Sequence, residues 1–421
     1  MSDIAMPVHV VAIVGAAISG SVAARILAER GCEVVVFEQN DRPYGKIEDG
    51  LPRWHAKLRQ REYRKIDDRL THPRIHFVPR TRLGRDLDFE SLARGWGFSA
   101  LLLALGAWRD RPLDVPGVDA YVDRGLIYQN PFVYWFNHKN ERAYAGPRYE
   151  VPGGTLCVGG GLASIDVMKI IQLEIYERAL RKRGIETTMS ELEHEGIATF
   201  CKAKGADPKA LGVTDGLLIY RRRAEDMPLA ERAHPTPEQR KSAEVIRKRT
   251  LEVAERKFLF QFQERRLPRR VIVEGERLAG LTVVETVVDG RKVETVPGSE
   301  VDLRAPLVIS SIGSLPEKIA GLAMRGETYA FNSGDTGEYE ALPGVFGLGN
   351  VVTGKGNIHE SEEHGESVAR HVATSYLAAK DKLAPAPATI LLERARRRQR
   401  EVGYDGDYAA WMSRNTPADL E

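Results

Sequence analysis

The feature that most constrains this 421-residue chain is an apolar strand, a glycine turn and a helix close to its N-terminus. Val10–Val14 is an apolar, mostly β-branched run, and Gly15-Ala-Ala-Ile-Ser-Gly20 follows it directly. Apolar residues then recur at helical spacing until a second apolar run begins at Val34. That run ends at Glu38, 23 residues after Gly15. The order predicts a strand, a tight turn, a helix and a second strand with a carboxylate at its end.

Each part of this pattern suits the binding of a dinucleotide. The N–H groups at the start of such a helix bind a pyrophosphate, and the acid after the second strand binds a ribose hydroxyl. A glycine-rich segment more than three hundred residues later, Gly347–Ile358, has the character of a second piece of the same site. Together the two segments predict a flavin-binding domain with another domain inserted in its middle. The residues expected to contact the dinucleotide at the first turn are Gly15, Ala16, Ala17, Ser19, Gly20, Glu38 and Gln39.

A second copy of the same pattern lies in the middle of the chain. A buried strand is predicted at 155–158, and it opens into Gly159-Gly-Gly-Leu-Ala-Ser164 and a helix. One glycine turn is weak support, because such turns also occur for packing alone; two turns 144 residues apart are much stronger. One dinucleotide in each domain is the arrangement that a flavoprotein fed by a nicotinamide needs. The residues expected at this second turn are Gly159, Gly160, Gly161, Leu162 and Ala163.

The nicotinamide coenzyme is predicted to be NADP rather than NAD. The strand 217–220 ends in three consecutive arginines, at the place where an NAD enzyme would keep an acid. The guanidinium groups of Arg221 and Arg222 suit a 2′-phosphate through paired hydrogen bonds. The alternative interpretation is an arginine run that is simply solvated.

Composition and sequence patterns exclude several other classes of protein. Lys and Arg number 61 against 59 Asp and Glu, so the net charge of +2 gives no reason to expect nucleic acid or a membrane surface as partner. No apolar run approaches the length of a membrane span, and no signal peptide is apparent. The three cysteines are far apart without a C-x-x-C, which excludes a redox dithiol or a cysteine-bound cluster within this chain. We expect this chain to have no metal site, and we expect the protein to be cytoplasmic.

The predicted fold is therefore α/β, with two Rossmann-like dinucleotide-binding domains. The FAD domain is expected at 1–118 and 307–380, where the strand 307–312 returns the chain to it. The NADP domain is expected at 119–306, with a charged helical insertion near 172–214. Residues 381–421 are predicted to form a basic C-terminal tail, whose arginines either dock an acidic electron carrier or line a solvated helix face.

Over roughly residues 8–375 the chain resembles the adrenodoxin-reductase and glutamate-synthase-small-subunit group of FAD-dependent NADPH oxidoreductases. Gly15–Glu38 is similar to the group's FAD fingerprint, and 103–117 resembles its "ATGA … IPG" crossover. Residues 159–166 resemble the "GGG-x-x-A-x-D" NADP turn, and 219–228 the "YRR … MP" segment. Gly349–Gly354 resembles "GDIVTG", and 129–137 the "F-V-x-W-Y-N" stretch.

The resemblance implies further FAD contacts. It places Gly349 and Asn350 at the ribityl chain, Gly45 and Lys46 beside the isoalloxazine, and His55 near the pyrimidine end of the flavin. For His55 a purely structural role is the alternative. The same resemblance adds Gly106 at the crossover, and backbone N–H groups of Gly356, Asn357 and Ile358 near the flavin carbonyls.

Three departures from the group's pattern matter. Ala17 replaces the second fingerprint glycine, which is tolerable only if its φ angle stays negative. Asn350 replaces an aspartate, so a neutral amide would meet the ribityl hydroxyl. The chain also lacks the cysteine-rich N-terminal segment that carries iron–sulfur clusters in the glutamate synthase small subunit, so a cluster is expected on a partner.

The function that the resemblance implies is an FAD oxidoreductase, like a ferredoxin–NADP reductase. It would exchange a hydride between NADPH and the flavin and pass electrons to a ferredoxin or another iron–sulfur protein. One alternative is an FAD-dependent reductase, oxidase or monooxygenase that acts on a small organic substrate. Another is a flavin-bearing electron-relay subunit that binds no nicotinamide. No catalytic side chain is assigned, because the flavin itself would supply the chemistry.

Overall fold

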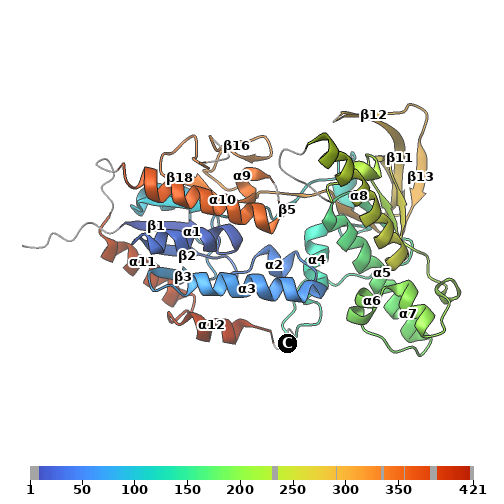
Figure 1. The fold of residues 1–421 in the computed structure, drawn as a ribbon, viewed down its shortest axis with the longest axis horizontal. Helices are drawn as coiled ribbons and strands as arrows, with labels where there is room; N and C mark the ends of the chain where they lie inside the picture. The colour runs from blue at the N-terminus through green and yellow to red at the C-terminus, as the bar shows by residue number, and fades with distance from the viewer. Residues whose placement is uncertain are drawn as a thin grey trace, which may run out of the picture. The chain divides into compact units, whose positions relative to one another are not determined.

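A computed structural model describes residues 9–229, 236–290, 292–332, 336–354, 356–379 and 386–417. The chain forms two compact α/β units. Unit 1 comprises the residues up to Arg109, 140–142 and those from Leu315 onward. Unit 2 comprises Asp110–Lys139 and Ala143–Ser314. Figure 1 shows the elements of each unit.

Unit 1 is built on a five-stranded parallel sheet in the order β18-β4-β1-β2-β3. Its strands are β1 (Val10–Val14), β2 (Glu33–Phe37), β3 (Ile75–Val78), β4 (Ala100–Leu103) and β18 (Val345–Gly347). Its helices of at least four residues, the π-helical turns apart, are α1 (Ile18–Glu29), α2 (Lys46–Asp49), α3 (Ala56–Leu70), α9 (Asn350–Thr353), α10 (Ile358–His371), α11 (Ala388–Glu401) and α12 (Tyr408–Asn415). The other short elements of this unit are η1 (Arg53–His55), the π-helical turns η2 (Ser91–Gly95) and η6 (Val372–Tyr376), and the strands β16 (Met324–Arg325) and β17 (Thr328–Tyr329).

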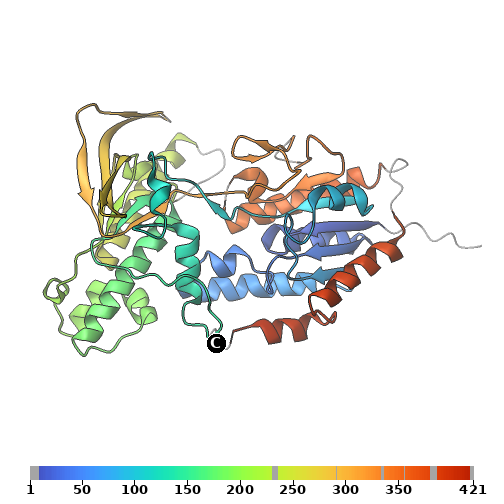
Figure 2. The same ribbon diagram turned by 180° about the vertical axis from the view of Figure 1, so that it is seen from behind.

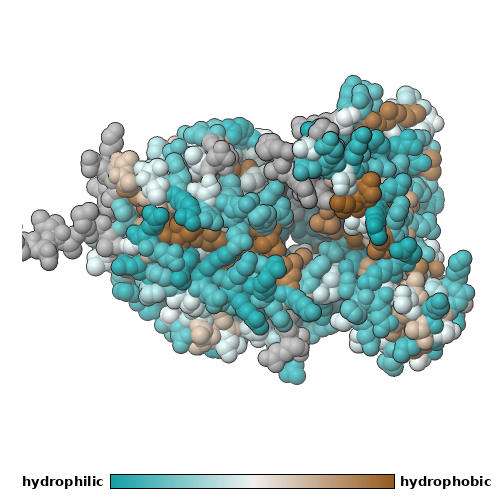
Figure 3. Space-filling view, viewed as in Figure 1, coloured by the Kyte–Doolittle hydropathy of each residue, from teal (hydrophilic) through white to brown (hydrophobic). Residues whose placement is uncertain are grey.

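The strands of this sheet are mostly apolar because both faces of the sheet are covered. The polar exceptions are Glu33 at the start of β2 and His76 in β3, which form a hydrogen bond with each other. In β1, Val11 and Ile13 pack into one core, while Val10, Ala12 and Val14 pack into the other. Side chains alternate across a strand, so two cores require an unbroken apolar run instead of an alternating one. The first core lies beneath α1, α3 and α10, and Figure 3 shows brown apolar atoms emerging between α3 and α10 on a face that is otherwise mostly hydrophilic.

Unit 2 repeats this plan with a parallel sheet in the order β6-β14-β7-β8-β9. An antiparallel sheet of β10, β11, β12 and β13 adjoins it in the sequence. The strands are β6 (Leu126–Tyr128), β7 (Leu156–Gly159), β8 (Leu217–Ile219), β9 (Gln261–Gln263), β10 (Arg266–Glu274), β11 (Arg277–Asp289), β12 (Lys292–Thr295), β13 (Val301–Arg304) and β14 (Val308–Ser311). The helical elements are η3 (Val118–Tyr121), α4 (Gln129–His138), α5 (Leu162–Lys182), α6 (Met189–Glu195), α7 (Ile197–Ala203), η4 (Pro208–Leu211), η5 (Ala224–Asp226) and α8 (Pro237–Phe258).

The two-residue strands β5 (Arg109–Asp110) and β15 (Ser314–Leu315) lie at the unit boundaries in the sequence. The predicted α/β class with two Rossmann-like sheets is confirmed. Near 172–214, where a charged helical insertion was expected, the end of α5 together with α6, α7 and η4 fills most of the stretch.

One predicted connection is wrong. The run 307–312 was expected to return the chain to the first domain, but β14 pairs with β6 and β7 inside unit 2. A buried parallel strand is equally apolar in either sheet, so its sequence does not reveal its neighbours.

The basic C-terminal stretch is also more than a tail. Residues 386–417 form α11 and α12 within unit 1, and Leu391 and Ala395 are buried. Residues 381–385 and 418–421 of the predicted tail lie outside the described residues.

We predict that the double-sided core of unit 1 dominates its stability. Leu102 on β4 is fully buried, so Leu102→Ala should lower the free energy of unfolding by about 2–5 kcal/mol through lost burial and a cavity. Ile390→Ala serves as the control, because Ile390 is 48% exposed, and its cost should stay below about 1 kcal/mol. Urea unfolding followed by circular dichroism measures both. Equal losses for the two variants would contradict this account of the core.

Candidate functional site

A cavity in unit 1 opens where the strands of the parallel sheet end. In folds of this kind ligands bind at the carboxyl ends of the strands, where adjacent connections diverge. The cavity and its open mouth enclose about 1090 Å³ of empty space. Its lining residues are Val14, Gly15, Ala17, Ile18, Ser19, Glu38, Gln39, Tyr44, Gly45, Lys46, Ile47, Thr81, Arg82, Leu83, Ala104, Leu105, Gly106, Ala107, Trp108, Glu317, Ile319, Tyr329, Asn350, Gly356, Asn357, Ile358 and Ser361.

The turn after β1 requires glycine because backbone carbonyl oxygens lie very close to it. Gly15 has a φ of +97°, and a Cβ atom there would lie 2.3 Å from the carbonyl oxygen of Ala104. A Cβ atom on Gly20 would lie 1.9 Å from the carbonyl oxygen of Gly15. Only glycine fits at both positions, so the start of α1 can approach the strand ends closely.

The N-terminus of α1 presents unpaired backbone donors at the cavity. No described side chain caps this helix, and its first turn contains no acidic residue. Intrahelical bonding begins with the N–H of Ser21, which donates to the carbonyl of Ala17. The preceding N–H groups and the helix dipole therefore favour an anion such as a pyrophosphate. Ala17 has a φ of −70°, so its methyl group fits the turn without backbone strain.

Glu38 holds a buried carboxylate at the end of β2. Its Oε2 accepts a hydrogen bond of 2.9 Å from the N–H of Ala16, and its Oε1 accepts one of 3.0 Å from the N–H of Asn40. Burial raises the pKa of Glu38 from 4.5 to about 7, although these two hydrogen bonds oppose the rise. Each carboxylate oxygen has a further lone pair, so the group can also accept from a ribose hydroxyl.

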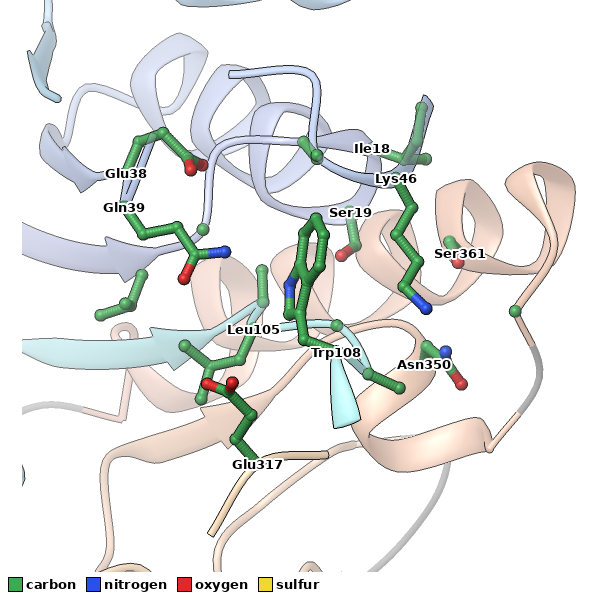
Figure 4. A pocket seen from close by; sticks show the side chains of 18 of the residues that line it. Ile18, Ser19, Glu38, Gln39, Lys46, Leu105, Trp108, Glu317, Asn350 and Ser361 are labelled. Carbon is green, nitrogen blue, oxygen red and sulfur yellow. The ribbon is translucent and has the colours of Figure 1, made fainter. Parts of the chain in front are cut away.

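Asn350, Gly356, Asn357 and Ile358, from the glycine-rich segment late in the chain, complete the cavity at the end away from Glu38. Figure 4 shows Glu38 and Gln39 on one side and Asn350 with Ser361 on the other, with the indole of Trp108 between them. Gly365 of α10 makes this closeness possible, because a Cβ atom there would lie 2.8 Å from the carbonyl oxygen of Ser19 on α1. The two ends of the sequence thus meet in one cavity, as the motifs predict.

Of the predicted contacts in unit 1, four do not line the cavity. Ala16 stands behind it as a donor to Glu38, and Gly20 packs against the turn. Gly349 has a φ of +66° and donates its N–H to Nδ1 of His364. His55 ends η1, is only half-buried and lies outside the lining. The other predicted residues are Gly15, Ala17, Ser19, Glu38, Gln39, Gly45, Lys46, Gly106, Asn350, Gly356, Asn357 and Ile358, and all of them line the cavity.

Sequence reasoning missed two groups of lining residues. Trp108 lies two residues after the predicted Gly106, and the ammonium of Lys46 is 5.7 Å from its ring, so the crossover motif could have indicated it. The second group carries no motif. Arg82 donates 2.7 Å hydrogen bonds to both carboxylate oxygens of Glu317, which joins the loop after β3 to the segment after β15.

The second glycine turn, in unit 2, has the same local design. A Cβ atom on Gly159 would lie 2.2 Å from Oγ of Ser164, and one on Gly160 would lie 2.2 Å from the ring of Tyr220. Gly161 is the N-cap of α5, whose first turn has no acidic residue and no described side-chain cap. Leu162 is 55% exposed, unusual for a leucine and consistent with a surface that a ligand covers.

The three arginines after β8 differ in their partners. Arg223 forms two hydrogen bonds with the carboxylate of Asp226, at 3.0 and 2.9 Å. Arg222 donates to the carbonyl of Gly290 at 2.6 Å and lies 3.7 Å from Asp226. Arg221 is exposed, and its guanidinium has no hydrogen-bond or ion-pair partner among the described residues. Arg221 is therefore the arginine most available to a phosphate.

The local design of these two turns fits the binding of nucleotides. Each combines a tight glycine turn with an uncapped helix start in a parallel sheet, and only the first has a carboxylate after its second strand. No group of side chains in the described residues could hold a metal ion. No helix in that part of the chain is long and apolar enough to cross a membrane. Fold and site together define a protein with two nucleotide-binding units of Rossmann type.

Comparison with known proteins points to a narrower group. The family model described as an NAD(P)-binding Rossmann-like domain matches residues 13–52. A glutamate synthase (NADPH) small chain from Mycobacterium tuberculosis is 32% identical over 131 residues, which cover 31% of this chain and 25% of the relative. A putative glutamate synthase (NADPH) small chain from Cereibacter sphaeroides is 28% identical over 202 residues, 44% of this chain and 46% of the relative. The chain thus spans less than half the length of these relatives.

Solved structures agree in fold over nearly the whole chain. The His57Gln mutant of FprA from Mycobacterium tuberculosis aligns with a TM-score of 0.72 at 17% identity, covering 94% of this chain and 91% of that one. FprA in complex with NADPH aligns with a TM-score of 0.69 at the same identity and coverage. At this identity the likeness shows a shared fold. The predicted resemblance to the adrenodoxin-reductase and glutamate-synthase-small-subunit group is confirmed.

The buried carboxylate predicts a pH dependence of stability in the cofactor-free protein. Between pH 4.5 and about 7 the folded protein holds a proton on Glu38 that the unfolded chain has lost. Stability should therefore fall as pH rises through this window, by at most about 1.4 kcal/mol per pH unit.

Glu38→Gln should remove this slope, because an amide does not titrate. Its NH2 group cannot accept a hydrogen bond, so the variant should also lose one of the two backbone hydrogen bonds at every pH. Urea midpoints at pH 5, 6, 7 and 8 measure the slope, with Glu90→Gln at an exposed position as the control. A slope that persists unchanged in Glu38→Gln would assign it to another group.

Proposed function

We propose that this chain is an FAD-dependent NADPH oxidoreductase that delivers electrons to a one-electron carrier. The proposal places FAD in the unit 1 cavity and NADPH at the second glycine turn. The observation that carries it is the meeting, in one cavity, of an uncapped helix start, a buried carboxylate, Asn350 and the residues Gly356, Asn357 and Ile358. The presence of a second glycine turn in unit 2 and the glutamate synthase (NADPH) relatives support it.

The unit 1 cavity fits the successive parts of FAD. The uncapped start of α1 suits the pyrophosphate, and Glu38 with Gln39 suits the adenosine ribose. Asn350 and the backbone of Gly356–Ile358 form the opposite end and suit the flavin half. The large aromatic wall of Trp108 lies between the two ends.

The residues of this chain orient the reactants and do not react themselves. When bound, FAD supplies the exchange of a hydride with a nicotinamide and the release of electrons one at a time. The glycine turns fix the phosphates, while Lys46 places a positive charge in the cavity wall. No protein nucleophile is required for this chemistry.

The proposed electron acceptor is a ferredoxin or another protein that carries an iron–sulfur cluster. The support comes from the relatives, since glutamate synthase small chains are components of a larger redox enzyme, and from the one-electron chemistry that a flavin allows.

We predict that the purified protein binds FAD and that NADPH bleaches its absorbance near 450 nm under anaerobic conditions. In stopped flow, a ferredoxin should then restore the absorbance faster than oxygen does. A flavin that NADPH cannot bleach would indicate an electron-relay subunit, and rapid reoxidation by oxygen or a small organic acceptor would indicate an oxidase or a small-substrate reductase. A protein that stays colourless with added FAD would refute the proposal.

The coenzyme preference should depend most on Arg221. Losing a charged hydrogen bond to the 2′-phosphate costs about 1.5–3 kcal/mol, so Arg221→Gln should weaken NADPH binding at least roughly tenfold and leave NADH nearly unchanged. Arg222→Gln should cost less, because Arg222 is already bound to the carbonyl of Gly290. The penalty should shrink at high salt, since an exposed charge is screened.

The matched control for this measurement is Arg223→Gln, whose guanidinium is held by Asp226. Rates of flavin reduction by NADPH and NADH give the preference for each variant. Equal, small losses with both coenzymes for Arg221→Gln and Arg222→Gln would mean that these arginines are a solvated run.

A further inference from the structure

The last two helices of the chain pack behind the wall of the unit 1 cavity. Figure 2 shows α11 and α12 in dark red along one side of unit 1, beside its blue strands. Leu391 and Ala395 of α11 are 0% and 1% exposed and belong to the same core as Val35 and Phe37 of β2. Residues 386–417 are called here the C-terminal clasp.

The first contact of the clasp is with the loop after β3. Nε of Arg398 donates to the hydroxyl of Thr81 at 3.0 Å, and its Nη2 donates to the carbonyl of Arg80 at 3.2 Å. The neighbouring Gln399 donates to the carbonyl of Phe77 at 2.7 Å. Thr81 itself lines the cavity, so this contact lies directly behind the cavity wall.

The second contact is with the loop after β2. The indole N–H of Trp411, a residue only 3% exposed, donates to the carbonyl of Asp41 at 2.7 Å. Tyr408 donates to Oδ1 of Asp67 at 2.7 Å, and that carboxylate also accepts from the hydroxyl of Tyr44. Tyr44 is a further lining residue.

The two loops are also bound to each other. The N–H of Thr81 donates to the carbonyl of Glu38 at 2.7 Å, and the N–H of Arg80 donates to the carbonyl of Asn40 at 3.2 Å. Arg80 has a φ of +50°, a left-handed conformation that is unfavourable for a residue with a side chain. Its guanidinium lies 5.0 Å from the ring of Trp411, so the clasp contacts both the backbone and the side chain of this strained residue.

We propose that the C-terminal clasp is a positioning element of the dinucleotide site. Through Arg398 and Trp411 it holds the loops after β2 and β3, and thereby places Glu38 and Gln39 for the ribose of the bound dinucleotide. This inference rests on the proposed function, because it takes FAD as the ligand of the unit 1 cavity. Groups held in place before binding lose less freedom on binding, so the clasp lowers the rate at which FAD leaves.

The first test measures the dissociation rate of FAD from two variants. Trp411→Phe keeps an aromatic ring but removes the N–H donor, and Arg398→Lys keeps the charge but removes the paired hydrogen bonds. Each should release FAD about three- to tenfold faster, the effect of one or two lost hydrogen bonds. The rate of reduction of the bound flavin by NADPH should stay within twofold of wild type, since neither residue lines the cavity.

Arg397→Lys is the matched control. Arg397 and Arg398 both pair with Glu401 on their own helix, but among the described residues only Arg398 also binds the loop after β3. Its FAD release should equal that of the wild type. If Trp411→Phe fails to fold, Arg398→Lys carries the test by itself. The proposal would be overturned if Arg398→Lys, and Trp411→Phe where it folds, released FAD at a rate within twofold of the wild-type rate.

The second test needs no cofactor. In the cofactor-free protein, hydrogen–deuterium exchange of peptides covering 38–42 and 79–82 should be faster in both variants, while peptides covering α1 and β4 keep the wild-type rate. Uniformly faster exchange across unit 1 would show only a loss of stability and would overturn the positioning role. A wild-type protein that binds no FAD would refute the proposed function, and the exchange rates would still decide whether the clasp orders these loops.

Discussion

The close approach of backbone to backbone at the first glycine turn is the constraint on which the rest of unit 1 depends. Gly15 and Gly20 leave no room for a side chain, because the carbonyl oxygens of Ala104 and Gly15 occupy that space. Only this closeness brings the start of α1 to the ends of β1 and β4. The N–H of Ala16 then reaches the carboxylate of Glu38, and the helix presents its unpaired donors at the cavity.

A buried carboxylate is costly unless it is hydrogen-bonded, and Glu38 shows how the surrounding structure offsets that cost. Two backbone N–H groups donate to it, yet burial still raises its pKa to about 7. A ribose hydroxyl would add a third donor, which favours the charged form. In the proposed complex with FAD, cofactor binding and proton release would thereby be coupled at Glu38, next to the loop that the C-terminal clasp contacts.

The two units repeat one local plan but differ in how their charged residues are used. In unit 1 the acid after the second strand is buried and accepts hydrogen bonds from two backbone N–H groups. In unit 2 the corresponding position carries arginines. Arg222 is bound to the carbonyl of Gly290 and Arg223 to the carboxylate of Asp226, while Arg221 is exposed and has no such partner among the described residues. Sequence alone could not separate these three arginines, because their partners lie 3 and 68 residues away along the chain.

The sequence by itself determined the two glycine turns, the strands on either side of them and the residues next to them, because these depend on local periodicity and on the absence of a side chain. Most predicted contacts of the unit 1 cavity accordingly line it. Only the tertiary structure decided what long-range packing controls. It assigned β14 to unit 2, brought Glu317 to Arg82, and placed Arg398 and Trp411 behind the loops after β3 and β2. These contacts join residues far apart in the sequence, and no periodicity in the chain encodes them.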